Sequence, residues 1–279
     1  MILLGYRDRN VHELIGHAVA VRAGSYRRVG VEVRAVSGAE HPDAALSAGL
    51  GGSLVETLNG QRSWRAALVH TLHPLFWGWG RPGTSWSDAG RVAGHPHGSI
   101  VWAFTEKVLG DRGVATEALD VQRFPVGTEG DRQRLEALRA GAVDVAVVGT
   151  AFAPSALERL GLVQLVFFGD EIRFPTAGVA VDTELVPPDD PGVRAVVEAQ
   201  REALGLIRSQ APVAVDAALE LLPGATREDA EGLLSHYLAP QYGPARTDVD
   251  AVGGDAIAWL SQVLTAAPGP AQTFYEEIR

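Results

Sequence analysis

The feature that most constrains the fold is an alternation of short apolar runs with longer helical patterns. The first apolar run covers residues 1–6, and the segment 11–23 then places Leu14 and Ile15 on one helical face. A second strand pattern, GVEVRAV, follows at residues 30–36. Short apolar runs separated by amphipathic helices are typical of βαβ units with parallel, buried strands. The sequence therefore predicts an α/β fold.

The later patterns divide this fold into two lobes. Five further strand patterns are predicted at residues 90–94, 120–125, 143–148, 162–168 and 176–181. We expect the first lobe to contain residues 1–92 and 177–279, and the second lobe residues 93–176. The chain would then cross between the lobes near 89–94 and 174–178, forming a two-strand hinge. In such folds ligands bind in the cleft where strands end and helices begin.

Three local predictions complete the first lobe. Residues 41–48 are predicted as a short helix that stops at the glycine-rich segment 49–52, and residues 53–57 as a strand. Residues 65–72 form a further predicted strand, which the run LFWGWG at 75–80 would continue on the hinge side of the first lobe. The remainder is predicted to be helical, in four segments: 191–210, 212–222, 227–238 and 255–266.

Composition excludes several functional classes. The net charge of −10 argues against nucleic-acid binding, which needs clustered Lys and Arg to neutralise phosphates. There are no cysteines, so disulfides, thiolate catalysis, zinc–thiolate sites and iron–sulfur clusters are excluded. Lys107 is the only lysine and falls in an amphipathic helical pattern, which argues against Schiff-base chemistry such as that of pyridoxal enzymes. We expect no cofactor.

The chain carries no predicted membrane span, because no window reaches about 18 uninterrupted apolar residues. Its first residues, MILLGYRDRN, lack the apolar core of a secretory signal. As it stands, the chain is expected to be cytoplasmic. A mature exported protein placed behind a new Met would look the same and would be extracytoplasmic. We expect a monomer or a weak dimer.

Several segments, in this order, resemble the type II periplasmic-binding-protein superfamily. They are the strand ILLGY, the strand GVEV, the segment HPLFWGWGRPGTSWSDAGRVAG, the helix–strand segment RLEALRAGAVDVAVVGTAFAP and the return strand FPTAGVAV. The chain is most similar to the nitrate, sulfonate and taurine solute-binding branch, which also contains the thiamine-pyrimidine synthases. The resemblance implies two lobes, each built on a mixed sheet flanked by helices, with a ligand between them and an ABC permease as a possible partner. A minority of the superfamily are enzymes, but the cysteines used by its desulfinases and pyrimidine synthases are absent here.

The leading candidate site is the segment HPHGS, residues 95–99, which ends a strand and opens a helix. Free backbone N–H groups and the helix dipole at such a start favour an anion. The alternative is an ordinary helix start, with Ser99 as its N-cap. Thr150 follows the strand VDVAVVG in the equivalent place. Arg7, Arg9, Asn10 and His12 follow the first strand and are expected to face the same cleft, where an arginine could pair with an anionic ligand.

Aromatic and polar residues extend this set. Four tryptophans, including Trp77, cluster around the first predicted crossing and could stack on a planar ligand, although such a cluster more often forms core. His70 and His73 are three residues apart in a predicted strand and would face opposite ways, so we expect no metal site. The predicted ligand-binding residues are Arg7, Arg9, Asn10, His12, Ser37, Ser53, Trp77, His97, Gly98, Ser99, Thr150 and Thr176.

Three functions remain open at this point. The first is a solute-binding protein that closes on a small anionic molecule, either aromatic or not, and presents it to an ABC permease. The second is a cofactor-independent lyase on the same fold, a decarboxylase or dehydratase of an aromatic or cyclic acid. Its acid–base residues would be His95, His97 and His41, with Arg9 as an electrostatic clamp. A cytoplasmic ligand sensor is a third alternative. The sequence favours binding over catalysis, because no committed nucleophile is present.

Overall fold

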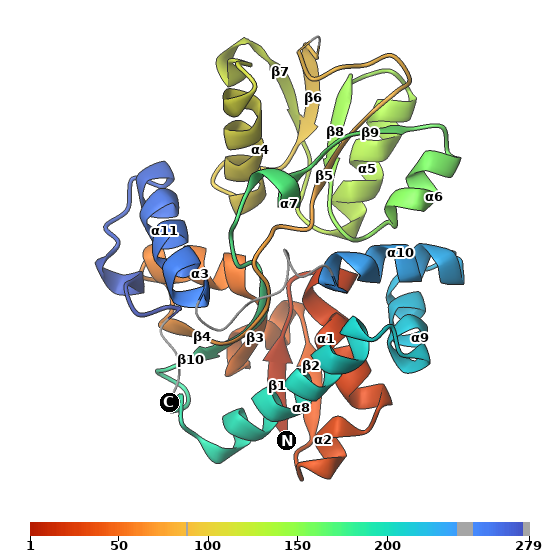
Figure 1. Ribbon diagram of the computed structural model, residues 1–279. Coiled ribbons are helices and arrows are strands. Elements are labelled where there is room, and N and C mark those ends of the chain that lie inside the picture. The colour runs from red at the N-terminus through yellow and green to blue at the C-terminus, as the bar shows by residue number, and fades with distance from the viewer. Residues whose placement is uncertain (88, 239–247, 276–279) are drawn as a thin grey trace.

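The protein is described by a computed structural model that covers residues 1–87, 89–238 and 248–275. Within these residues the chain forms two mixed sheets flanked by helices, one in each lobe (Figure 1). The strands of the first sheet are β1 (Ile2–Gly5), β2 (Val33–Val36), β3 (Leu46–Gly49), β4 (Trp64–Thr71) and β10 (Ala177–Asp182). Their order is β2-β1-β3-β10-β4, with β10 antiparallel to both of its neighbours.

The second sheet is built in the same way. Its strands are β5 (Trp77–Gly80), β6 (Arg91–Gly94), β7 (Asp120–Arg123), β8 (Val145–Val148) and β9 (Val163–Phe167). Their order is β7-β6-β8-β5-β9, with β5 antiparallel to β8 and β9. Strand β8, with the sequence VAVV, is fully buried, as its continuous apolar run predicts. The predicted two-lobed α/β fold is confirmed.

Helices cover both sheets. The first lobe carries α1 (Val11–Arg22), α2 (Ser25–Arg28), α3 (Leu50–Leu58), α8 (Pro191–Arg208) and α9 (Pro212–Leu221). The second carries α4 (Ile100–Asp111), α5 (Thr128–Arg139), α6 (Pro154–Arg159) and α7 (Phe168–Glu171). Two late helices contact both lobes: α10 (Arg227–Leu238) packs on α9 and α6, and α11 (Asp248–Val263) packs on α3 and α4. None of the helices in the described ranges is long and apolar enough to cross a membrane.

The chain crosses between the lobes twice, and the first crossing lies earlier than predicted. It falls between β4 and β5, because Trp77–Gly80 pairs with β8 and β9 of the second sheet. The predictions that residues 75–80 belong to the first lobe and that the crossing lies at 89–94 are therefore wrong. The placement of β5 is decided by pairing with β8 and β9, which are distant in sequence, and a local pattern does not reveal such pairing.

The second crossing, between α7 and β10, overlaps the predicted one at residues 174–178. The two crossing segments are hydrogen-bonded to each other, from Phe168 N to Phe76 O at 2.9 Å and from Phe174 N to Leu72 O at 2.7 Å. They run together between the lobes in Figure 1. The sheet assignments indicate that the lobe boundaries lie in these two crossing segments. The predicted first lobe also includes residues 239–247 and 276–279, which lie outside the described residues.

Two local predictions around the glycine-rich segment are also wrong. The predicted helix 41–48 is a 3₁₀ turn, Gly38–Asp43, followed by β3, and the predicted strand 53–57 lies inside α3. Gly49 is the N-cap of α3 rather than the end of a helix. Ser53 and Thr57 fit the helix because their hydroxyls donate to the carbonyls four residues earlier, at 2.8 and 2.9 Å.

Candidate ligand-binding site

A cavity of about 430 Å³ lies between the lobes and is lined from both. The first lobe contributes Arg7 and Glu56, for example, and the second His95 and Thr150. This volume lies in the range of about 300–1,000 Å³ that is usual for small-molecule sites. The cavity is therefore large enough for one small ligand.

Four helices begin at this cavity, because each follows a strand that ends there. Their N-cap residues, Asn10 of α1, Gly49 of α3, Ser99 of α4 and Gly127 of α5, all line it. Asn10 Oδ1 accepts from Glu13 N at 2.9 Å, and Ser99 Oγ accepts from Trp102 N at 3.2 Å. Ser99 thus caps the helix start, as the alternative interpretation predicted, and it also lines the cavity.

The structure brings together part of the predicted set. The predicted ligand-binding residues that line the cavity are Arg7, Asn10, His12, Gly98, Ser99, Thr150 and Thr176. Those that do not line it are Arg9, Ser37, Ser53, Trp77 and His97. Of the four residues proposed for a lyase, His95, His97, His41 and Arg9, only His95 lines the cavity. The geometry therefore does not assemble that acid–base group around one ligand.

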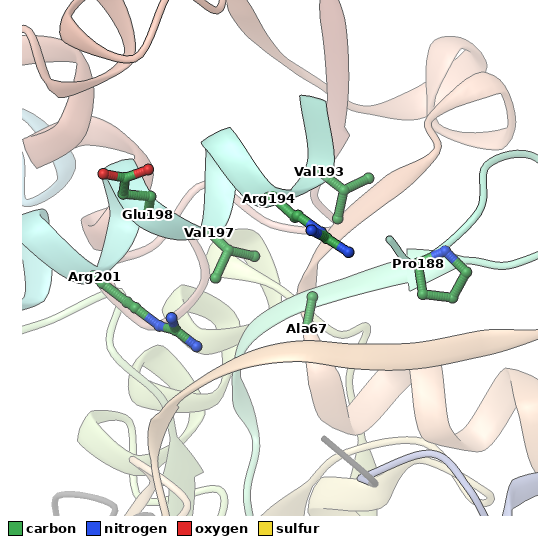
Figure 2. Close-up of a pocket in the computed structure, with 7 residues that line it drawn as sticks. All are labelled: Ala67, Pro188, Val193, Arg194, Val197, Glu198 and Arg201. Atoms are coloured by element: carbon green, nitrogen blue, oxygen red, sulfur yellow. The ribbon is translucent and has the colours of Figure 1, made fainter. Parts of the chain in front are cut away.

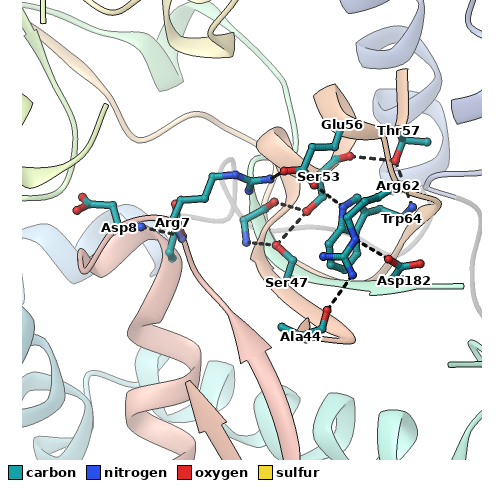
Figure 3. A network of polar contacts seen from close by, with 12 residues as sticks. Arg7, Asp8, Ala44, Ser47, Ser53, Glu56, Thr57, Arg62, Trp64 and Asp182 are labelled. Atoms are coloured by element: carbon teal, nitrogen blue, oxygen red, sulfur yellow. Dashed lines mark hydrogen bonds and ion pairs between the residues drawn. The ribbon is translucent and has the colours of Figure 1, made fainter. Parts of the chain in front are cut away.

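The residues outside the cavity have structural positions. Trp77 is buried and stacks on Phe167 with ring centroids 5.0 Å apart, so it belongs to the core of the second lobe. Ser53 is buried within α3, where its Oγ atom lies 3.0 Å from Ser47 Oγ (Figure 3). Arg9, Ser37 and His97 are exposed, and the His41 ring lies against Gly5.

Arg7 is held in place by its own lobe. Its guanidinium donates to Glu56 Oε1 at 2.6 Å, and the indole N–H of Trp64 donates to Glu56 Oε2 at 2.6 Å (Figure 3). A Cβ atom on Gly52 would lie 2.4 Å from the guanidinium carbon of Arg7, so only glycine allows this close approach. Arg7 thus reaches the cavity as half of an ion pair.

Three rings form one wall of the cavity. The centroid of Phe76 lies 5.9 Å from that of His12 and 6.0 Å from that of His95. Burial lowers the pKa of His12 to about 4, partly offset by a hydrogen bond to the backbone of Thr176. Burial, and secondarily the charge of Arg134, hold the pKa of His95 well below its usual value. Both imidazoles are therefore neutral near pH 7, and the Nδ1 atom of each is buried without a hydrogen-bond partner.

Two hydrogen bonds join the lobes at this cavity. The backbone N–H of His12 donates to Thr150 Oγ1 at 2.7 Å, and Thr128 Oγ1 donates to the Asp8 carboxylate at 3.0 Å. Because the partners in each bond come from opposite lobes, both bonds exist only while the lobes are close together. The geometry is that of a cavity closed by the approach of two lobes.

Solved structures with the same architecture are known at low sequence identity. The alkanesulfonate-binding protein SsuA of Xanthomonas axonopodis pv. citri, bound to MOPS, matches with a TM-score of 0.72 at 14% identity, covering 96% of this chain and 94% of that one. The ligand-binding component of an ABC-type import system from Staphylococcus aureus matches with a TM-score of 0.73 at 15% identity, covering 99% and 96%. The Candida albicans CA3427 gene product, described as having the generic periplasmic-binding-protein fold, matches with a TM-score of 0.71 at 10% identity, covering 100% and 97%.

This chain has the periplasmic-binding-protein fold. The resemblance found in the sequence is confirmed at the level of architecture, and the structural neighbours include sulfonate-binding proteins of the SsuA type. Neither a protein-family model nor a curated protein sequence matches the chain. At these identities the similarity shows the fold and leaves the ligand to be argued from the cavity.

The cavity residues that the sequence analysis missed include Glu13, Phe76 and Asp131. Glu13 could have been found from the spacing Asn10-x-x-Glu13, which is typical of a helix start. Phe76 lies in the run that was assigned to the wrong lobe. Asp131 is buried, pairs with the fully buried Arg134 at 2.5 Å and accepts from Gly149 N at 3.0 Å. No local signal identifies such a pair, because its burial depends on the tertiary fold.

A second cavity, of about 360 Å³, lies outside the interlobe site, between β4 and α8 of the first lobe (Figure 2). We refer to it as the α8 groove; its lining includes Ala67, Val197, Arg194, Arg201 and Glu198. Both arginine side chains are exposed. The α8 groove therefore differs from the interlobe cavity in having more cationic than anionic side chains.

Proposed function

We propose that this protein binds one small molecule in the interlobe cavity and presents it to a membrane importer of the ABC type. The observation that carries the proposal is a ligand-sized cavity, lined from both lobes, at the point where four helices begin. Similar solved structures are named as a sulfonate-binding protein and as a component of an ABC-type import system, which supports this function.

The two-lobed geometry supports capture by closure. A ligand in the cavity would touch both lobes, and it would favour the arrangement in which His12 N–H reaches Thr150 and Thr128 reaches Asp8. Anything that binds the closed form better than the open form shifts the population toward closure. A permease can then distinguish loaded from empty protein by the relative position of the lobes.

The lining of the cavity favours a partly apolar ligand with a flat ring. The Phe76 ring, flanked by two neutral imidazoles, offers a face on which a planar molecule can stack, and Val55 and Ile100 add apolar lining. This supports the aromatic part of the predicted ligand. The predicted negative charge has less support, because Arg7 already pairs with Glu56.

A ligand screen tests the proposed function. Thermal unfolding would be followed for the full chain with a library of small aromatic acids, amides and amines. A bound ligand in excess raises the stability of the native state. We expect at least one compound to raise the melting temperature, and Phe76→Ala to abolish the shift. Phe124→Ala is the matched control, since Phe124 is also partly buried but does not line the cavity. Shifts that survive Phe76→Ala would contradict the proposed site.

A further inference from the structure

The charges around the interlobe cavity are strongly unbalanced. Four carboxylates line it, those of Asp8, Glu13, Glu56 and Asp131, whereas Arg7 is the one cationic side chain among the described residues that line it. Arg134 lies behind Asp131 and is fully buried. Even with both arginines counted, the carboxylates outnumber the cations, four to two.

Both arginines are already paired. Arg7 donates to Glu56 at 2.6 Å, and Arg134 donates to Asp131 at 2.5 Å and to the carbonyl of Pro125 at 2.9 Å. A ligand carboxylate or sulfonate would have to compete with these carboxylates for the same guanidinium groups. Breaking a partly buried pair leaves an uncompensated charge, which is costly.

The other two carboxylates accept hydrogen bonds from the chain and lie near helix starts. Glu13 accepts from Arg7 N at 2.7 Å, and Asp8 accepts from Asn10 Nδ2 at 2.9 Å and from Thr128 Oγ1, in the first turn of α5, at 3.0 Å. A Cβ atom on Gly127, at the start of α5, would lie 3.0 Å from Asp8 Oδ1. A Cβ atom on Gly49, at the start of α3, would lie 3.6 Å from Glu13 Oε1 and 3.3 Å from Arg7 Nη1. Helix N-termini attract anions. Glu13 near the start of α3 and Asp8 near the start of α5 already supply negative charge there. These two helix N-termini are therefore less able to attract an anionic ligand.

The aromatic wall of the cavity carries no charge. The imidazole of His12 is 7% exposed and hydrogen-bonds to the backbone of Thr176, while its Nδ1 atom has no partner. Because burial keeps the imidazoles of His12 and His95 neutral, the wall that they form with Phe76 adds no positive charge that would attract an anion. Carboxylates and an uncharged aromatic wall thus line the same cavity.

We propose that the interlobe cavity selects a planar organic cation, an amine or amidinium group on a flat apolar ring, and disfavours carboxylates and sulfonates. This inference rests on the proposed function and replaces the anionic ligand predicted from the sequence. The cationic group lies near Glu13 and Glu56, and the ring stacks on Phe76. The selectivity arises because a positive ligand relieves the repulsion among the surplus carboxylates, whereas a negative ligand increases it.

Three probes of the same shape test the sign of the charge: benzamidinium, benzamide and benzoate. Their affinities for the full chain would be measured by isothermal titration calorimetry at low and high salt. We expect benzamidinium to bind at least about tenfold more tightly than benzoate, with benzamide between them and the difference reduced by salt. Benzamidinium that fails to bind at millimolar concentration, or binds no better than benzoate, overturns the proposal.

Variants locate the effect. Glu13→Gln should weaken benzamidinium binding by about tenfold, and Glu56→Gln should in addition free Arg7 and strengthen benzoate binding. Glu198→Gln is the control, because it removes an exposed carboxylate in the α8 groove. Thermal unfolding of each variant confirms that it is folded.

The α8 groove requires a separate control, because its arginines could bind benzoate (Figure 2). The double variant Arg194→Gln, Arg201→Gln removes the arginines of the α8 groove. If benzoate still binds this variant as tightly as benzamidinium does, the proposed selectivity for a cation is contradicted. If that benzoate binding is then lost with Phe76→Ala, the interlobe cavity is still the binding site, and the proposed function stands with an anionic ligand. The two proposals can therefore fail separately.

Discussion

The lobes contact each other at the cavity and again on the outer side, where α6 meets α10 (Figure 1), and the two contacts differ in chemistry. At the cavity the links are single hydrogen bonds, His12 N–H to Thr150 and Thr128 to Asp8. On the outer side the Nη1 and Nη2 atoms of Arg159 donate to the carboxylate of Asp229 at 2.6 and 2.5 Å. The Ser155 hydroxyl donates to the same carboxylate at 2.5 Å.

Aromatic packing adds to the outer contact. The His236 ring of α10 lies 4.7 Å from the Phe167 ring and 5.3 Å from that of Trp77, measured between centroids. These rings belong to the second sheet, whereas α10 also packs on α8 and α9 of the first lobe. From this comparison we expect the outer contact to be retained when the lobes move apart, and the cavity contact, with its single hydrogen bonds, to be the one that opens.

The largest expected effect comes from Asp229→Ala. The Asp229 carboxylate is fully buried, and besides Arg159 and Ser155 it accepts from Thr226 N at 2.8 Å, while Asp229 N donates back to Thr226 Oγ1. This is a capping box at the start of α10. We expect the free energy of unfolding in urea to fall by about 2–4 kcal/mol, from the lost cap and the lost charged hydrogen bonds.

The neighbouring Glu228 provides the control. Its side chain is exposed, so Glu228→Ala should change the free energy of unfolding by less than about 0.5 kcal/mol. If both variants lose the same free energy of unfolding, the Asp229 contact contributes no more to stability than an exposed side chain does. The outer contact would then not be stronger than the cavity contact.

Much of this architecture could be predicted from the sequence, because local patterns determine it. The buried run VAVVG and the helix before it identify β8 and α5, and Asp190 with Pro191 marks the start of α8. The strand pairing of β5 could not be predicted in this way. Its partners are distant in sequence, so the same apolar run fits either sheet.

In the candidate site, too, local features could be predicted and features that depend on tertiary contacts could not. Residues that directly follow strands, such as Arg7, Asn10 and Thr150, were predicted to face the cleft and do line the cavity. The balance of charge could not be predicted, because it depends on which partners each residue meets. Arg7 suggested an anionic ligand until its pairing with Glu56 was known, and Asp131 gave no sign of its burial against Arg134.

Acidification should weaken the cavity contact before the outer one. Burial lowers the pKa of His12 from 6.5 to about 4, so the unfolded chain takes up this proton first and stability falls as the pH drops from about 6.5 toward 4. His17 and His70, with pKa values also lowered to about 4 by burial, act in the same direction. The pKa of Asp131, raised by burial to about 6, acts in the opposite direction, because its protonation on acidification removes a buried charge.

At the outer contact the Arg159 guanidinium holds the pKa of Asp229 well below its usual value, so this pair remains ionised throughout that range. The free energy of unfolding in urea should be lower at about pH 5 than at about pH 7, and His12 should account for about 2 kcal/mol of this decrease. His12→Gln should reduce the loss by that amount, whereas His97→Gln, at an exposed position, should leave it unchanged. An equal pH dependence in all three proteins would contradict the assignment to His12.

The smallest effect, and the sharpest test of the cavity contact, is expected from Thr150→Val. Valine keeps the shape of this buried residue but leaves His12 N–H without its partner, which should cost about 1–2 kcal/mol. Thr105→Val is the matched control, since the buried Thr105 hydroxyl donates at 2.8 Å to Val101 O within α4 and crosses no boundary between lobes. Small-angle scattering should show a more extended particle for Thr150→Val alone, because the cavity contact then keeps only the hydrogen bond from Thr128 to Asp8. If both variants scatter like the wild type, the cavity contact does not control closure, and the ligand must act through other groups in the cavity.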